Sequence, residues 1–532
     1  MSKTSKKFYA AVHKANATAL LNIAPELLKL NPKSLDYDYL AKSVVVLANA
    51  KHFREALLFA NKALDVDHAR IEVPELVFWI YINTQKYQDA DDALTLLKAH
   101  PEAKARESNY LDWEIMLANA LFDLDRVVRL FEVRGSPPSK SDVRFSELSA
   151  AFVRSVGIAS PSSVDEWLEG VNVEHLIQSP YGLDAYTTYL VQNGRPQQAI
   201  EMLKAALLGP MKGHAELDWN LALLQISAGD SEGWIRWLNR WESTLFPSPL
   251  RTFDMPRWNG SDSIRGKQVL IWGEQGLGDE IKFLTMLPPL LSLEPSEVTL
   301  EVNKKITGLV RTWFPECIVR ESGANDCKGH PEYAKFDYQM PIGDLPSRFY
   351  NYADRTKRYL DLAEFGDQLK EKLRLKFGNQ KPIIGISWRS NKLTIKRNAV
   401  YVSMSWVLDL VRQFEGELNF VSLQVNLSDQ EREEILNSSN IIEPEVDFFN
   451  EVFEQAKYIA ACDLVVTAPT SVGQIAGAVM TPTITWLEKN HPQLEGGNHR
   501  FWFDTVHYIR TERSFDRGSL LLKVSRLLKK IL

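Results

Sequence analysis

The chain has 532 residues, which suggests three or four domains at about 150 residues each. Its formal net charge of −6 argues against a general nucleic-acid binder or a protein of acidic membrane surfaces, because both need a basic surface. The 3 cysteines are scattered and show no metal-ligand spacing, so we expect reduced thiols rather than a disulfide framework or a zinc site.

The N-terminal sequence does not predict a targeting segment. Its apolar residues are interrupted by His13, Lys14 and Asn16, whereas a signal peptide needs a continuous apolar region. No other run approaches the roughly 18 apolar residues of a membrane helix. We therefore expect a cytoplasmic protein with no membrane span.

The first half of the chain predicts an array of helices. Phe53 and Tyr87 are 34 residues apart, and so are Ala199 and Gly233, within segments of similar pattern. A helix–turn–helix period of 34 residues is typical of tetratricopeptide repeats. We predict a repeat solenoid of this type over 1–245, whose concave face binds a protein partner. The alternative is a helical domain with a purely structural role.

The second half predicts two α/β lobes, 251–365 and 381–515, followed by a C-terminal helix at 516–532. Short apolar runs bounded by turn residues predict strands at 267–273, 296–303, 382–388, 417–424, 463–469 and 481–487. Helical segments lie between most of them, and this order predicts parallel sheets. Ligands of such sheets bind at the carboxyl ends of the strands, so we expect the site in the cleft between the lobes.

Three segments carry a resemblance to a known family: PRWNGSDSIRGKQVLIWGEQGLGDEIKF (256–283), FVSLQ (420–424) and TSVGQIAGAVMTPT (470–483). They resemble the catalytic region of bacterial tetratricopeptide-repeat glycosyltransferases, which is similar to the heptosyltransferases and has the two-lobed GT-B fold. The resemblance covers about 250–515. It implies metal-independent transfer of a sugar, with inversion, from a nucleotide-sugar substrate to protein hydroxyls such as those of flagellin, with no further cofactor.

The turn after the first strand holds the candidate acid–base residues. Glycines before a helix allow close approach of a ligand, but two carboxylates here would repel a phosphate. Asp279 occupies the position of the general base proposed for the heptosyltransferases, and Glu280 is a second candidate for this role. Gln275, Gly276 and Gly278 form the turn on the acceptor side. The alternative is that Asp279 only caps the helix.

Basic residues follow the first strand of the second lobe. Arg389 and Lys392 lie at the end that is expected to bind ligand, where cations would neutralise the diphosphate leaving group. Lys396 and Arg397 are as consistent with a solvated basic loop as with donor binding. Gln424, at the end of a later strand, is a candidate for hydrogen bonding to the base or ribose.

A second candidate for phosphate binding is the helix start at 469–474. Thr470 and Ser471 offer hydroxyl and N–H groups at a helix N-terminus, and Gly473 would allow close approach of a ligand. The matching heptosyltransferase loop carries an Asp and a His, whose places are taken here by Pro469 and Gln474. This departure is consistent with a changed donor or with loss of activity. A simple capped helix is the competing interpretation.

Two DxD patterns, at 65–67 and 123–125, lie in the helical half and far from any nucleotide-type strand, so we interpret them as helix and turn charges and predict no catalytic metal. Two other functions remain open: a transferase of lipopolysaccharide or other surface glycans, and a non-catalytic adaptor with a degenerate lobe pair. UDP-, GDP- and ADP-sugars and CMP-linked nonulosonic acids all remain possible donors. We expect 1–240 to bind the acceptor protein and 245–532 to bind the nucleotide.

Overall fold

The structure is a computed structural model that describes residues 3–84, 86–121, 123–142, 144–159, 161–171, 173–244, 246–350, 359–391, 400–488, 491, 502–511 and 516–532. The chain divides into two compact units, Met1–Tyr189 and Leu190–Leu532. No helix within the described ranges combines the length and the apolar character that crossing a bilayer requires.

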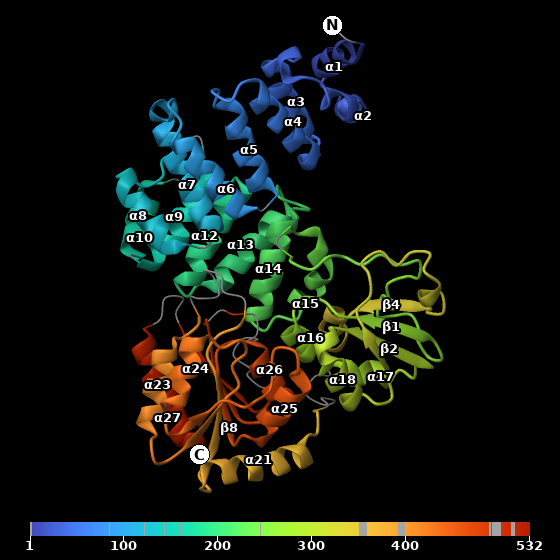
Figure 1. The fold of residues 1–532 in the computed structure, drawn as a ribbon, viewed down its shortest axis with the longest axis vertical. Helices are drawn as coiled ribbons and strands as arrows, with labels where there is room; N and C mark the ends of the chain where they lie inside the picture. Colours follow the sequence, from blue (N-terminus) through green and yellow to red (C-terminus); the bar gives the residue numbers. More distant parts are fainter. Residues whose placement is uncertain are drawn as a thin grey trace. The chain divides into compact units, whose positions relative to one another are not determined.

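The first unit is helical, as the sequence predicts (Figure 1). Its helices are α1 (Lys3–His13), α2 (Ala17–Leu27), α3 (Tyr37–Asn49), α4 (Phe53–Val66), α5 (Glu72–Asn83), α6 (Tyr87–Lys98), α7 (Glu107–Ala120), α8 (Leu124–Arg134), α9 (Phe145–Ala159), α10 (Pro161–Gly170), α11 (Val173–Leu176) and α12 (Pro180–Gln192). Helices α3 and α4 pack together, and so do α5 and α6. Ala56 and Ala90, which are one period apart, are both fully buried in these pairs. Small side chains there let two helices approach closely.

The second unit begins with helices rather than with a sheet. These are α13 (Pro196–Leu208), α14 (Ala215–Ser227), α15 (Glu232–Arg236) and the 3₁₀ helix η3 (Trp237–Glu242). The division between the two compact units falls within α12. Helix α15 and η3 pack on the first α/β lobe, because the ring centroids of Trp234 and Trp237 each lie 6.5 Å from that of Phe283. The domain boundary that we predict near residue 245 stays a prediction.

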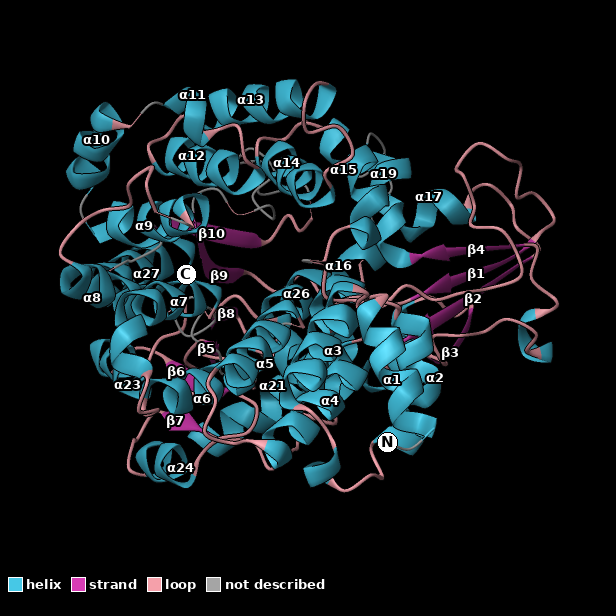
Figure 2. Ribbon diagram, turned by 90° about the horizontal axis from the view of Figure 1, so that it is seen from above, coloured by secondary structure: helices cyan, strands magenta, loops and turns pink. Residues whose placement is uncertain are grey.

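The first lobe is built on a four-stranded sheet of β1 (Gln268–Trp272), β2 (Glu297–Val302), β3 (Ile318–Glu321) and β4 (Tyr338–Pro341). The order is β3-β2-β1-β4 and every neighbouring pair is parallel (Figure 2). Its helices are α16 (Leu277–Leu284), α17 (Leu287–Leu291), α18 (Thr307–Trp313) and α19 (Leu345–Phe349), with short 3₁₀ turns η4 (Lys304–Ile306), η5 (Pro331–Tyr333) and η6 (Ile342–Asp344). The expected strands at 267–273 and 296–303 are confirmed.

The second lobe has a six-stranded sheet of β5 (Ile383–Ser387), β6 (Asn419–Ser422), β7 (Ile441–Ile442), β8 (Leu464–Thr467), β9 (Thr483–Glu488) and β10 (Val506–Thr511). The order is β10-β9-β8-β5-β6-β7, again parallel throughout (Figure 2). Its helices are α21 (Ala363–Phe377), α23 (Met404–Gln413), α24 (Asp429–Leu436), α25 (Val452–Ala461), α26 (Ser471–Ala478) and α27 (Arg517–Ile531). The four strands expected here and the C-terminal helix are confirmed.

Candidate functional site

The turn between β1 and α16 has an unusual backbone. Gln275 adopts φ +63°, in the left-handed region that favours glycine. Gly276, the N-cap of α16, has an ordinary φ of −117°. The left-handed backbone conformation is therefore adopted by Gln275, although residues with a side chain normally avoid it. Residues in such conformations concentrate at functional sites, and they persist only where surrounding contacts hold them in place.

Gly278 brings the two lobes together. A Cβ at this position would lie 3.2 Å from Cγ of Gln474 and 3.3 Å from Cα of Ser471, both on α26. Helices α16 and α26 therefore pack with their first turns in contact, and any side chain at Gly278 would have to push the neighbouring atoms aside. The two segments that the sequence assigned to the acceptor side and the donor side meet at this point.

Asp279 and Glu280 follow on α16 but face different surroundings. The Asp279 carboxylate is partly exposed, at 32% of its side chain, and its Oδ1 lies 3.3 Å from Nζ of Lys282. Gly276, not Asp279, is the N-cap, so the capping interpretation of Asp279 does not describe this helix start. An accessible carboxylate can receive a proton from a bound hydroxyl.

The carboxyl group of Glu280 is buried against the backbone. Its Oε2 accepts a hydrogen bond of 2.9 Å from the N–H of Asn303, and the group lies directly over Gly273. Burial raises its pKa to about 8, although the Asn303 hydrogen bond acts in the opposite direction. Glu280 thus connects the turn to the end of β2 and is poorly placed to meet a substrate.

The start of α26 is open on one side. Thr470 is the N-cap residue, but its hydroxyl makes no hydrogen bond to the first N–H groups of the helix. Gly473 lets α26 approach β8, because a Cβ there would lie 3.3 Å from Cγ2 of Thr467. A narrow pocket opens here, lined by Pro469, Thr470, Gly473, Gln474, Thr485, Leu487, Val506 and Tyr508.

Three polar atoms around this region lack partners. Oε1 of Gln474 and Oγ1 of Thr485 are buried in the pocket wall, and no described residue offers either a hydrogen bond. In the turn of the first lobe, Nε2 of Gln275 is also buried, and no described residue accepts a hydrogen bond from it. Buried polar groups are nearly always satisfied, so a water or a ligand group is the natural partner here. The pocket holds about 10 Å³, which suits about one water-sized group.

Arg389 and Gln424 have other partners. Arg389 forms a two-pronged ion pair with Glu431 of α24 and donates a hydrogen bond of 3.0 Å to the carbonyl of Asn426. Gln424 accepts 3.0 Å hydrogen bonds from the N–H groups of Trp388 and Arg389 and donates to two carbonyls. Both side chains hold the loop after β5: the amide of Gln424 is fully hydrogen-bonded within the protein, and Nε and Nη2 of Arg389 are both engaged there.

Lys392, Lys396 and Arg397 lie outside the described residues. Among the described residues no group of three His, Cys, Asp or Glu side chains could hold a metal ion. The DxD segments occupy helix ends: Asp123 caps α8 by accepting from the N–H of Arg126, and Asp67 accepts from the N–H of Ala69. These contacts match the interpretation of the two segments as helix and turn charges.

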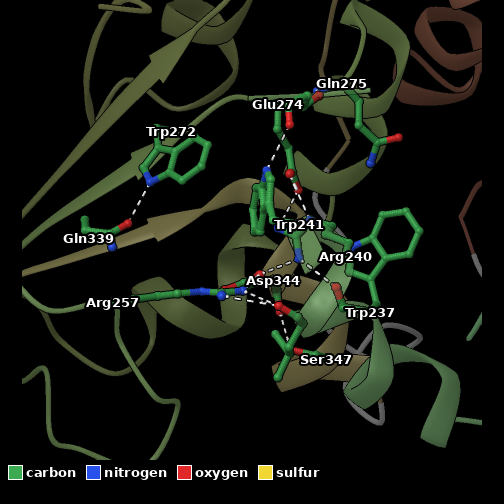
Figure 3. A network of polar contacts seen from close by, with 12 residues as sticks. Trp237, Arg240, Trp241, Arg257, Trp272, Glu274, Gln275, Gln339, Asp344 and Ser347 are labelled. Atoms are coloured by element: carbon green, nitrogen blue, oxygen red, sulfur yellow. Dashed lines mark hydrogen bonds and ion pairs between the residues drawn. The ribbon is translucent and has the colours of Figure 1, made fainter. Parts of the chain in front are cut away.

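A buried charge network beneath the turn was not predicted from the sequence (Figure 3). Arg240 of η3 pairs with Glu274 and with Asp344, and Arg257 also pairs with Asp344. Burial raises the pKa of Glu274 to about 7, against the lowering effect of Arg240. No local signal marks these four residues, because the partners are far apart in the chain and join only on folding.

Comparison with known proteins gives partial matches. No family model matches the chain. Protein FlbA of Caulobacter vibrioides is 28% identical over 340 residues, which are 60% of this chain and 56% of that protein. The chain thus spans little more than half the length of this relative.

Among solved structures, the E. coli ADP-heptose LPS heptosyltransferase II is 13% identical, with a TM-score of 0.37, over 49% of this chain and 99% of that chain. A tetratricopeptide repeat protein of Parabacteroides merdae is 15% identical, with a TM-score of 0.34, over 46% of this chain and 92% of that chain. Both TM-scores are below 0.5.

Proposed function

We propose that this chain is a glycosyltransferase that moves a sugar from a nucleotide-sugar donor to Ser or Thr hydroxyls of a protein, recruited by the helical repeats. The observation that carries the proposal is the contact at Gly278. It joins the accessible carboxylate of Asp279 in one parallel α/β lobe to the open helix start at Thr470 in the other. Two such lobes are the architecture of the GT-B transferases that the sequence resembles.

In the proposed reaction, Asp279 takes the proton of the acceptor hydroxyl while that oxygen attacks the anomeric carbon of the donor sugar. The bond to the nucleotide phosphate breaks at the same carbon, with inversion. The N–H groups at the start of α26 then stabilise the negative charge that develops on the leaving phosphate, as helix N-termini do. Thr470 and Ser471 add hydroxyl donors at this end of the helix.

Gln474 and Thr485 supply the proposed contact to the donor itself. Their unpartnered oxygens share one small pocket, which admits a single group such as a sugar hydroxyl. A site that hydrogen-bonds a hydroxyl discriminates strongly against a donor that lacks it, because its own buried groups would be left unpaired. We leave Arg389 and Gln424 out of the proposed donor site, since Arg389 is paired with Glu431 and the amide of Gln424 is fully hydrogen-bonded.

The proposal is tested by offering the full chain a panel of UDP-, GDP-, ADP- and CMP-sugars carrying a labelled sugar, together with extract of the source bacterium. Flagellin is the first acceptor to examine. Label on a protein band supports the proposal. Label on a lipid-linked glycan would point to surface-glycan synthesis, and no transfer with any donor would point to an adaptor.

A further inference from the structure

Residues 237–244 and 246–248, which precede the first sheet, contact the turn at two consecutive residues. Nε and Nη2 of Arg240 donate to the two carboxylate oxygens of Glu274, at 2.9 and 2.7 Å. Both side chains are fully buried, at 0% exposure. This fork geometry fixes the orientation of a carboxylate as well as its position.

The second contact is made by Ser248. The N–H of Gln275, the left-handed residue of the turn, donates to Oγ of Ser248 at 2.7 Å. The carbonyl of Ser248 in turn accepts from Nε1 of Trp241 at 3.1 Å. The Trp241 ring lies 3.8 Å from the guanidinium carbon of Arg240, so the two contacts are parts of one assembly.

The carboxylate of Glu274 is enclosed on its other sides as well. A Cβ at Gly343 would lie only 1.7 Å from Oε1 of Glu274, so the carboxylate fills the space over that backbone. The third nitrogen of Arg240, Nη1, lies 2.9 Å from Oδ1 of Asp344, and Arg257 holds the same carboxylate at 2.6 Å. The guanidinium groups of Arg240 and Arg257 thus form one ion-pair network with the carboxylates of Glu274 and Asp344.

We infer that Arg240 is a positioning residue, which holds the turn 273–278 in its strained conformation through Glu274 and Ser248 and thereby sets the place of Asp279. The helices before the sheet then contribute to catalysis and not only to recruitment of the acceptor protein. The inference rests on the proposed function only in assigning a reaction to Asp279. The anchoring of the turn can be measured without any donor.

The test compares full-length Arg240→Lys and Glu274→Gln with the control Arg251→Lys. Arg251 forms a similarly buried pair with Glu301 in the same lobe, 2.6 Å apart, and its other hydrogen bonds go to Ala324, Cys327 and Tyr333 rather than to Glu274 or Gln275. Amide hydrogen exchange is followed by mass spectrometry in peptides covering 273–284. Turnover is followed with whichever sugar nucleotide of the panel the wild type consumes.

We expect exchange in this peptide to rise about 10-fold in both network variants and to stay at the wild-type rate in the control. We also expect kcat to fall about 10- to 100-fold, with the nucleotide Kd unchanged, only in the network variants. Equal exchange in Arg240→Lys and Arg251→Lys would overturn the inference, and so would faster exchange with full turnover.

If one of the two network variants fails to fold, the other still tests the inference. A wild type that consumes no donor would sink the proposed function, and the exchange comparison would then decide the anchoring alone.

Discussion

Gly278 of α16 lies directly against Gln474 of α26, with 3.2 Å between Cγ of Gln474 and the place that a Cβ at Gly278 would take. Cα of Ser471 is almost as close, at 3.3 Å, and this atom belongs to backbone that cannot rotate away. The contact therefore brings the two lobes close together at this point. It sets how near the Asp279 carboxylate stands to the helix start that we propose for the donor phosphate.

Gly278→Ala should separate the two helices. Alanine is the better helix former, but a methyl group forced into this contact costs about 1–3 kcal/mol and shifts α16 from α26. We expect turnover to fall about 10- to 100-fold, because small misplacements of reacting groups have effects of this size. Kinetics and thermal unfolding of the same preparation provide the check.

Gly276→Ala is the matched control, since a Cβ there would meet only Oδ2 of Asp279, at an ordinary 3.7 Å. It should cost at most about 1 kcal/mol, as a change of N-cap residue, and leave turnover within a few-fold. Equal losses in the two alanine variants would show that the contact of α16 with α26 does not matter for the reaction.

Gln474→Met should separate stability from donor binding. The amide oxygen of Gln474 is buried with no partner among the described residues, so an apolar side chain of similar length should stabilise the fold by about 1–3 kcal/mol. The same change should weaken binding of the sugar nucleotide relative to the free nucleotide. Calorimetric titration with both ligands measures the difference.

Gln424→Met is the corresponding control, because every polar atom of that amide is hydrogen-bonded. It should lower stability and leave the ratio of the two affinities unchanged. If Gln474→Met leaves sugar-nucleotide affinity intact, the pocket beside Thr485 holds a water and not part of the donor.

Glu280→Gln should change how stability depends on pH. Burial raises the folded-state pKa of Glu280 to about 8 from an ordinary 4.5, so between these values the folded chain keeps a proton that the unfolded chain has lost. Stability therefore falls as pH rises through this window, by up to about 1.4 kcal/mol per pH unit for this group. The glutamine variant keeps an acceptor for the N–H of Asn303 and should remove this part of the decline.

Urea unfolding from pH 5 to pH 9 measures the two slopes. Glu274, whose pKa is also raised, remains in the variant and keeps part of the slope in both proteins. Parallel curves for wild type and variant would mean that Glu280 is ionised in the folded state, and would return it to consideration as a base.

Arg389→Ala tests the arginine that the sequence suggested for the donor phosphates. Its ion pair with Glu431 is largely buried, with side-chain exposures of 17% and 13%. We expect a loss of about 1–3 kcal/mol in stability and a nucleotide Kd within about two-fold of wild type. Arg432 lies on the same helix as Glu431, and Arg432→Ala, which breaks a more exposed pair with Glu443, should cost less than about 1 kcal/mol. A nucleotide affinity lowered about ten-fold by Arg389→Ala would restore the phosphate role.

Much of the fold could be predicted because local sequence patterns indicate its helices and strands. The runs that became β1, β2, β5 and β6 are apolar, β-branched and bounded by turn residues, and the 34-residue spacing marks the helical pairs. Strands β3 and β4, of four residues each, escaped because polar residues interrupt them and neighbouring strands supply their stability. The packing of Trp234 and Trp237 on Phe283 could not be predicted, because the sequence does not show what either tryptophan contacts.

The candidate site was predictable in part for the same reason. The resemblance drew attention to Asp279 and Gly278, and their neighbours on α26 lie where the order of strands and helices requires. Side-chain partners could not be read in this way. Arg389 looked free for a phosphate because Glu431 lies 42 residues further along the chain, on α24. The pairing of Arg240 with Glu274 likewise joins two residues that no local pattern connects.

The most direct test of the account is transfer of labelled sugar from the donor panel to protein by wild type and by Asp279→Asn, at matched folded concentration. Asparagine keeps the shape of the side chain but cannot take the proton of the acceptor hydroxyl. We predict labelled protein with the wild type, and a turnover reduced about 10²- to 10⁴-fold in the variant with nucleotide affinity unchanged. Transfer by Asp279→Asn within a few-fold of wild type, or no transfer by the wild type with any donor, would contradict it.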